Sequence, residues 1–205
     1  MKGTRGQATT LSQAAVWRVD RAASPLLVVL LLLLLTSCTR APEPLPTYGE
    51  IPNFTLTAHT GAPFSLGDLE GKVWVADFIF TNCTGPCPRM SSLMRKVQNS
   101  LGDLPDVRFV SFTVDPERDT PEVLAAYGKR FQAREGIWFF LAGPKPTLDM
   151  LSREAFKLGN LGADHSTRFV LVDRHARIRG YYGTSDETGW KRLLADVRRI
   201  SEEPS

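Results

Sequence analysis

Two apolar segments, residues 73–80 (VWVADFIF) and 107–114 (VRFVSFTV), restrict the fold of this 205-residue chain more than any other feature. Both are rich in β-branched and aromatic residues, which is typical of strands buried on both faces. A helical pattern lies between them, and a second begins at Thr120-Pro121, where a capping hydroxyl precedes a proline. Because strands that alternate with helices pair in parallel, the sequence predicts an α/β sheet covered on both faces.

The remaining predicted elements make the sheet mixed. We expect hairpins over residues 54–66 and 168–182, a third core strand over 137–141, and helices over 88–101, 121–132, 147–158 and 187–200. The strands of the last hairpin are joined by a short turn and should pair antiparallel. This order predicts a thioredoxin-like three-layer sandwich with a mixed central sheet, an extra N-terminal β-hairpin and a helix inserted before the third core strand.

The first 37 residues have the pattern of an export signal. Ten consecutive leucine and valine residues, Leu26–Leu35, follow Arg18 and Arg21. Ten residues at ~1.5 Å each cover about half of a ~30 Å bilayer core, as in a secretory signal peptide. The sequence before Cys38 resembles a bacterial lipobox, which implies acylation of Cys38; an uncleaved signal anchor is the alternative. We expect a lipoprotein, exported and tethered on the periplasmic face of the bacterial cell envelope.

Charge and composition limit what the rest of the chain can bind. The formal net charge of +3 lies in the first 37 residues, which hold four basic side chains and one acidic side chain. The neutral remainder has no electrostatic footprint for nucleic acid. Residues 38–50 are proline-rich and predict a semi-extended tether, which leaves residues 51–205 as the folded domain.

Cys83 and Cys87 are the candidates for chemistry. They lie in residues 81–88 (TNCTGPCP), where a predicted buried strand ends and a helix begins. This position binds ligands in α/β sheets, and a helix N-terminus is expected to lower a thiol pKa. Thiolates serve metal binding and disulfide exchange alike. The CxxxC spacing permits a wider distance between the sulfurs than CxxC, which suits a soft ion such as Cu(I), although a disulfide stays geometrically possible.

His165 is the candidate third ligand. It lies in the loop before residues 168–173, and in a thioredoxin-like fold this loop faces the cysteine loop. Thioredoxins place a cis-proline there, whereas this chain has no proline in that region. A histidine hydrogen-bonded within its own loop is the alternative. His59 and His175 lie in predicted turns, and we expect both to be solvated.

Three segments of the chain resemble the Sco/SenC family. They are residues 75–88 (VADFIFTNCTGPCP), 114–127 (VDPERDTPEVLAAY) and 164–166 (DHS), within a similarity that spans roughly residues 48–200. Thr84 departs from the proline that many relatives have after the first cysteine. The turn at Arg174-His175-Ala176-Arg177 lacks the usual glycine. Neither departure removes a residue that the family uses as a ligand.

The resemblance implies a copper-binding protein that serves assembly of the CuA centre of cytochrome c oxidase. The family's copper ligands carry over to Cys83, Cys87 and His165 of this sequence. Two thiolates satisfy Cu(I), and an imidazole adds the nitrogen donor that Cu(II) prefers. Oxidation to a Cys83–Cys87 disulfide would prevent binding. The implied partners are the oxidase subunit that bears CuA and an extracytoplasmic thiol–disulfide reductase.

Two carboxylates are candidates for supporting the site without binding the metal. Asp77, in the strand before the cysteine loop, is either a proton-transfer group or a paired structural acid. Asp164 either orients His165 through a hydrogen bond or is an exposed loop acid. We expect Asp115 and Asp119 to form a turn and cap the helix that follows.

The residues leave two functional classes open. A copper chaperone and a thiol–disulfide oxidoreductase that reduces cysteines of the oxidase subunit, or of other exported proteins, both need a reactive dithiol. A thiol peroxidase has less support, because Cys83 lacks obvious peroxidase surroundings. The CxxxC spacing, the missing cis-proline and the position of His165 favour the chaperone.

Overall fold

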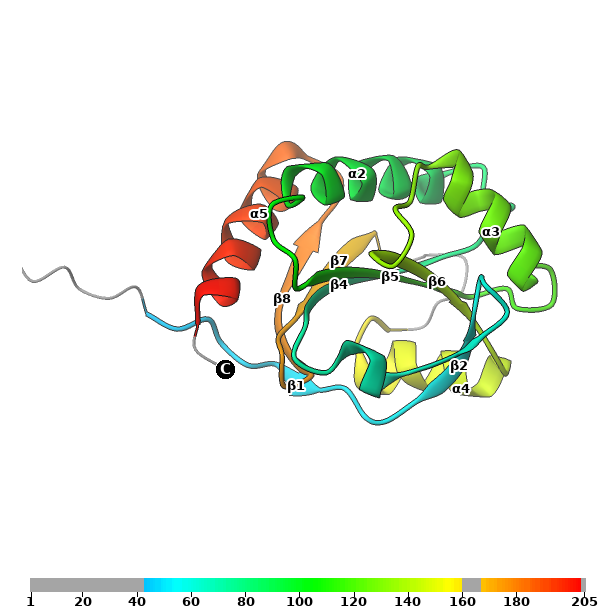
Figure 1. The fold of residues 1–205 in the computed structure, drawn as a ribbon, viewed down its shortest axis with the longest axis horizontal. Coiled ribbons are helices and arrows are strands. Elements are labelled where there is room, and N and C mark those ends of the chain that lie inside the picture. Colours follow the sequence, from blue (N-terminus) through cyan, green and yellow to red (C-terminus); the bar gives the residue numbers. More distant parts are fainter. Residues whose placement is uncertain (1–42, 160–166, 204–205) are drawn as a thin grey trace, which may run out of the picture. The chain divides into compact units, whose positions relative to one another are not determined.

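The computed structural model describes residues 43–159 and 167–203, in which eight strands form one mixed sheet (Figure 1). The strand order is β1-β8-β7-β4-β5-β6-β2-β3. The strands are β1 (Gly49–Glu50), β2 (Thr55–Ala58), β3 (Pro63–Ser65), β4 (Val73–Ile79), β5 (Val107–Thr113), β6 (Trp138–Ala142), β7 (Arg168–Val172) and β8 (Arg177–Gly183). The helices are η1 (Leu66–Leu69), α2 (Pro86–Ser100), α3 (Pro121–Arg130), α4 (Lys145–Met150), η2 (Leu151–Ala155) and α5 (Glu187–Glu202).

Strand β4 lies at the centre, and all seven of its residues are buried. It pairs in parallel with β5 from Val73↔Val107 to Ile79↔Thr113, and antiparallel with β7. Alternate residues of β4 enter two separate apolar layers, one beneath α2, α3 and α5 and the other above α4. Figure 1 shows these helices on the two faces of the sheet. The predicted thioredoxin-like three-layer sandwich is confirmed.

Both predicted hairpins are present. β2 and β3 pair antiparallel, and so do β7 and β8. The first hairpin also joins the central sheet, because Ala58 of β2 pairs with Leu141 of β6. The extra N-terminal hairpin therefore extends the edge of the sheet that β6 would otherwise form.

The helix expected over residues 147–158 differs in the structure. α4 begins at Lys145, directly after Pro144, and passes into the π-helical turn η2. The Phe156 N–H donates to the Leu151 carbonyl, five residues back, which is the π-helical spacing. The chain then leaves the helix at Lys157, which has a left-handed φ of 53°. A local rearrangement of this kind leaves the apolar periodicity almost unchanged, so it cannot be predicted from the side-chain pattern.

The folded unit begins earlier than the expected Ile51. It starts at Pro44, and Gly49 of β1 pairs with Ile178 of β8. Arg179, which is only 4% exposed, donates to the carbonyls of Leu45 (2.8 Å) and Pro46 (3.3 Å). These contacts are made to main-chain atoms of the proline-rich segment, so the side-chain pattern does not predict them.

Arg179 also belongs to a buried ion network. Its guanidinium bonds the carboxylates of Asp173 (2.9 Å) and Glu203 (3.1 Å). Burial alone would raise the pKa of Asp173, but hydrogen bonds from Arg177 and Arg179 outweigh it and lower that pKa. The network joins the start of β8, the end of α5 and the segment before β1.

In the described part of the chain, no helix is both long enough and apolar enough to cross a bilayer.

Candidate metal and thiol site

The two cysteines lie where the sequence predicted, between the end of β4 and the start of α2. Cys83 lies in the connecting loop and donates its N–H to the Phe80 carbonyl (3.3 Å). Cys87 is the second residue of α2 and is fully buried, whereas Cys83 keeps 8% of its surface exposed. Both are free thiols, and the neighbouring Cys83 side chain contributes to the raised pKa of Cys87. Both cysteines are therefore buried, and Cys83 is the less completely buried of the two.

The expected lowering of the thiol pKa is wrong for Cys87. Burial, reinforced by the hydrogen bond to Cys83, raises the pKa of Cys87 to about 12, although a backbone hydrogen bond at Phe80 acts in the opposite direction. The helix offers little compensation, because Pro86 and Pro88 flank Cys87 in the first turn and have no N–H to donate. The Cys87 thiol keeps its proton at neutral pH until a metal or an oxidant displaces it.

A buried carboxylate, Asp119, holds the cysteine loop in place. The Thr81 N–H donates to its oxygens at 3.1 and 3.3 Å, and the Thr81 hydroxyl donates as well. Thr113, at the end of β5, donates its hydroxyl to the other side of the same carboxylate. Asp119 is fully buried. It therefore joins the ends of two parallel strands at a point two residues before Cys83.

The role of Asp119 differs from the expected cap. Helix α3 is capped by Thr120, whose hydroxyl accepts from the Val123 N–H (3.4 Å). Asp115 behaves as expected of a turn residue: its carbonyl accepts from the Asp119 N–H (3.0 Å). The signal for Asp119 was present in the sequence, since a threonine lies at or just beyond the end of each neighbouring parallel strand. Sequence reasoning did not connect those hydroxyls with an acid in the next loop.

Asp77 lies on β4 and has one satisfied oxygen. Its Oδ1 accepts from the Ser111 hydroxyl (2.5 Å), and that hydroxyl oxygen accepts from the indole N–H of Trp138 (2.9 Å). Its Oδ2 is buried with no hydrogen-bond partner among the described atoms. Burial raises the pKa of Asp77 to about 7, against the opposing effect of Ser111. A negative charge on Asp77 also raises the pKa of Cys87, so the two groups interact electrostatically.

Three expected site residues, His165, Asp164 and Cys38, lie outside the described residues. The residue two positions after His165 is informative. Thr167 borders a cavity of about 320 Å³ together with Gly85 and Pro86 of the cysteine segment. Thr167, the first described residue after His165, thus lies beside the start of α2.

The two remaining histidines are not gathered at the site. His175 is exposed in the turn between β7 and β8, as expected. The expectation for His59 is wrong: its ring is half-buried edge-on against Phe140, and its Nδ1 accepts from the Phe140 N–H (3.3 Å). Burial lowers the pKa of His59. Within residues 43–159 and 167–203, no three histidine, cysteine or acidic side chains converge as metal ligands would.

Comparison with known proteins identifies the family. The SCO1/SenC family model matches residues 43–202. The chain is also 32% identical to the SCO1 protein homolog of Bacillus subtilis, over 84% of this chain and 93% of that protein. This chain belongs to the SCO1/SenC family. It is 31% identical to a Stutzerimonas stutzeri protein named "Putative copper-binding protein", over 67% of this chain and 71% of that one.

Solved structures agree with this assignment. A SCO1/SenC family lipoprotein from Bacillus anthracis has a TM-score of 0.70 at 34% identity, over 75% of this chain and 96% of that chain. BsSco, described as a Sco-family cytochrome c oxidase assembly protein with a disulfide switch, has a TM-score of 0.70 at 31% identity, over 80% and 99%. Copper-bound ScoI of Bradyrhizobium japonicum has the same fold, with a TM-score of 0.60 at 22% identity, over 74% and 99%.

The Asp119 interaction predicts how tightly the cysteine loop is held. We expect Asp119→Asn to increase the rate of iodoacetamide alkylation of Cys83 about tenfold, because the amide cannot accept all the bonds that the carboxylate accepts. Asp115→Asn, in the same segment, is the matched control and should leave the rate within about twofold. Far-UV circular dichroism would check that both variants fold. Equal rates in the wild type and Asp119→Asn would contradict the assigned role.

The buried carboxyl of Asp77 predicts a pH-dependent stability. Between about pH 4 and 7 the folded protein keeps this proton while the unfolded chain, with the ordinary pKa of 3.8, releases it. The folded state therefore binds more protons, and the free energy of unfolding falls as pH rises, by ~1.4 kcal/mol per unit. Urea unfolding from about pH 4.5 to 7 should show the wild type losing about 3 kcal/mol more than Asp77→Asn. Parallel pH profiles for the two proteins would refute this prediction.

Proposed function

We propose that this protein is a copper carrier that holds Cu(I) or Cu(II) through Cys83, Cys87 and His165 and supplies it for assembly of the CuA centre of cytochrome c oxidase. The observation that carries the proposal is the pair of free, neighbouring thiols that follow the carboxyl end of β4. Thiolates are the ligands that Cu(I) prefers, and two of them suffice for it, whereas structural zinc takes four ligands. Two of the relatives described above are a named copper-binding protein and an oxidase assembly protein.

The unequal burial of the cysteines suggests the order of ligand exchange. Cu(I) binds Cys83 first and displaces its thiol proton to solvent, and the Cys87 proton leaves to solvent as the second sulfur–copper bond forms. Release to an acceptor site reverses this order, with Cys83, the less buried cysteine, as the ligand through which copper passes. His165 supplies the nitrogen donor that stabilises Cu(II) in this scheme. The acceptor is the oxidase subunit that bears CuA.

The same thiols favour a second candidate function, thiol–disulfide exchange. A cysteine that is slightly exposed beside one that is fully buried suits attack by the first sulfur and resolution by the second. Oxidation of the pair to a disulfide releases two electrons and two protons to a disulfide-bonded partner protein, which is reduced to its dithiol. An extracytoplasmic thiol–disulfide reductase is then needed to restore the thiols and with them copper binding.

Copper titration of the reduced protein separates these functions. We expect one copper per chain, with Cys83→Ser and Cys87→Ser losing Cu(I). His165→Ala should weaken Cu(II) binding by at least about tenfold and Cu(I) binding far less. His175→Ala, an exposed histidine in a turn, is the matched control and should bind both ions as the wild type does. Absence of copper binding together with rapid insulin reduction would favour the oxidoreductase instead.

We also propose that the protein is a lipoprotein anchored through Cys38 to the periplasmic face of the bacterial cell envelope. The support is the short apolar run before Cys38, together with a similar protein described as a lipoprotein. In cells grown with a labelled fatty acid, the Cys38→Ser protein should carry no label, because the sulfur that accepts the fatty acid is gone. Fatty-acid labelling that survives this substitution would refute acylation at Cys38.

A further inference from the structure

A groove runs along α2 from the cysteine segment toward the start of α5. It consists of two adjoining cavities of about 310 and 320 Å³, which share Arg89, Thr184 and Ser185. The second cavity includes Gly85 and Pro86, the two residues immediately before Cys87. The groove is therefore continuous with the segment that carries the thiols.

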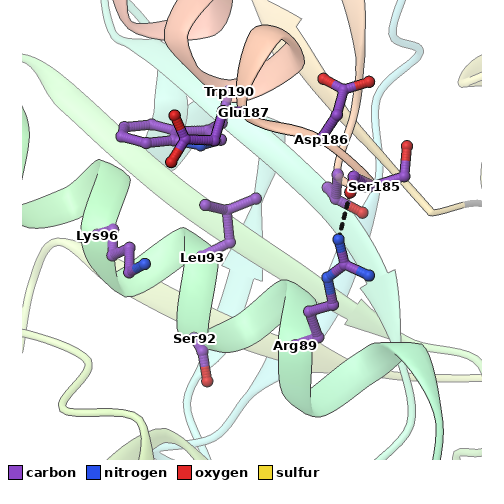
Figure 2. Close-up of a pocket in the computed structure, with 9 residues that line it drawn as sticks. Arg89, Ser92, Leu93, Lys96, Ser185, Asp186, Glu187 and Trp190 are labelled. Atoms are coloured by element: carbon purple, nitrogen blue, oxygen red, sulfur yellow. Dashed lines mark hydrogen bonds between the residues drawn. The ribbon is translucent and has the colours of Figure 1, made fainter.

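The floor of the first cavity is apolar and its α2 wall is basic. Figure 2 shows Leu93 of α2 pointing toward Trp190 of α5, with Arg89 and Lys96 on either side of Leu93. These three α2 residues are spaced i, i+4 and i+7, so they lie on one face of the helix. Leu93 and Trp190 are only partly buried, whereas Arg89 and Lys96 are exposed.

The basic side chains of this groove make no close ion pair within the described residues, although Lys191 and, across the groove, the charge of Lys96 lower the pKa of Glu187. No carboxylate in residues 43–159 or 167–203 forms an ion pair with Arg89 or Lys96. Arg89 donates one N–H to the Ser185 carbonyl, which fixes its guanidinium across the groove. The acids on the opposite rim are engaged: Asp186 caps α5 by accepting from Gly189 (3.0 Å), and Glu187 pairs with Lys191 (2.7 Å).

We propose that this groove binds an extended acidic segment of the protein that accepts copper from this chain. The complementary groups would be two carboxylates for Arg89 and Lys96, and an apolar side chain between them for the Leu93–Trp190 floor. Arg89 and Lys96 are seven residues apart on the helix, or ~10.5 Å along its axis. Acidic residues at positions i and i+3 of a polyproline II segment span ~9 Å on one side, which matches this distance.

The proposal rests on the proposed function for the identity of the partner only. Binding of such a segment beside Pro86 would bring the rest of the partner next to Cys83, the less buried of the two cysteines. The positive charges of Arg89 and Lys96 would speed the encounter at low salt and fix its orientation. The groove thus assigns partner selection to α2 and α5, separately from the copper ligands.

The test uses the full chain in a nonionic detergent and a fluorescein-labelled eight-residue peptide, proline-rich, with glutamate at positions 3 and 6 and leucine at position 5. Fluorescence anisotropy should give a weak dissociation constant, below about 1 mM. Lys96→Glu should weaken binding about fivefold and the double variant Lys96→Glu/Arg89→Gln more than tenfold. Lys129→Glu, the same charge change on exposed α3, is the control and should stay within about twofold.

A reversed pair sharpens the result. A peptide with lysine in place of both glutamates should bind Lys96→Glu more tightly than the wild type, because the attraction is restored. The proposal is overturned if the glutamate peptide does not bind, if a glutamine version binds equally well, or if Lys129→Glu weakens binding as much as Lys96→Glu does. Self-association, or binding to phosphatidylglycerol vesicles, that Lys96→Glu abolishes would assign the groove to a second copy or to lipid, and would overturn it too.

Copper stoichiometry measured in the same samples keeps the two proposals apart. Lys96→Glu should bind copper as the wild type does, because Lys96 lies on the outer face of α2 and is not a ligand. A wild type that binds the peptide but no copper would refute the carrier function and leave the acidic-segment site standing. A wild type that binds copper but no peptide would refute the acidic-segment site and leave the carrier function standing.

Discussion

The geometry of the thiol site depends on one buried carboxylate. Asp119 accepts hydrogen bonds from Thr81 and Thr113, and so joins the loop after β4 to the end of β5. A buried carboxylate without such donors would be costly, which means that the interaction constrains both threonines as much as the acid. Because Thr81 is held in place, Asn82 is the single residue between this fixed point and Cys83. Asp119 thus positions the loop that carries Cys83, the less buried of the two cysteines.

The sheet provides the second constraint, because β4 is buried along its whole length. Its side chains enter two apolar layers in alternation, so its register against β5 and β7 cannot slip without exposing one layer. Cys87 and Met94 of α2 pack into one of these layers, which anchors the helix to the sheet. The high pKa of Cys87 follows from this packing. A chain that buries a thiol to hold a helix in place also keeps that thiol protonated until a ligand arrives.

Much of the fold and part of the site could be predicted from local pattern. The run VWVADFIF predicted a fully buried strand, and the CxxxC segment after it predicted a strand-to-helix turn with two thiols. The π-helical turn at Leu151–Ala155 and the pairing of Gly49 with Ile178 could not be predicted, because neither alters side-chain periodicity. The half-buried ring of His59 was missed for a related reason, since its partner Phe140 lies 81 residues away in the sequence.

Sequence alone determined the order of strands and helices, the α/β class and the identity of the two thiols, because these follow from periodicity and spacing within short segments. Tertiary structure alone decided which thiol is less buried, the direction of the Cys87 pKa shift and the role of Asp119. Each of these depends on groups that are distant along the chain but adjacent in space. It also brought Leu93 and Trp190 together, from helices nearly 100 residues apart, to make the groove. Burial and electrostatics act through space, and a one-dimensional pattern does not record those distances.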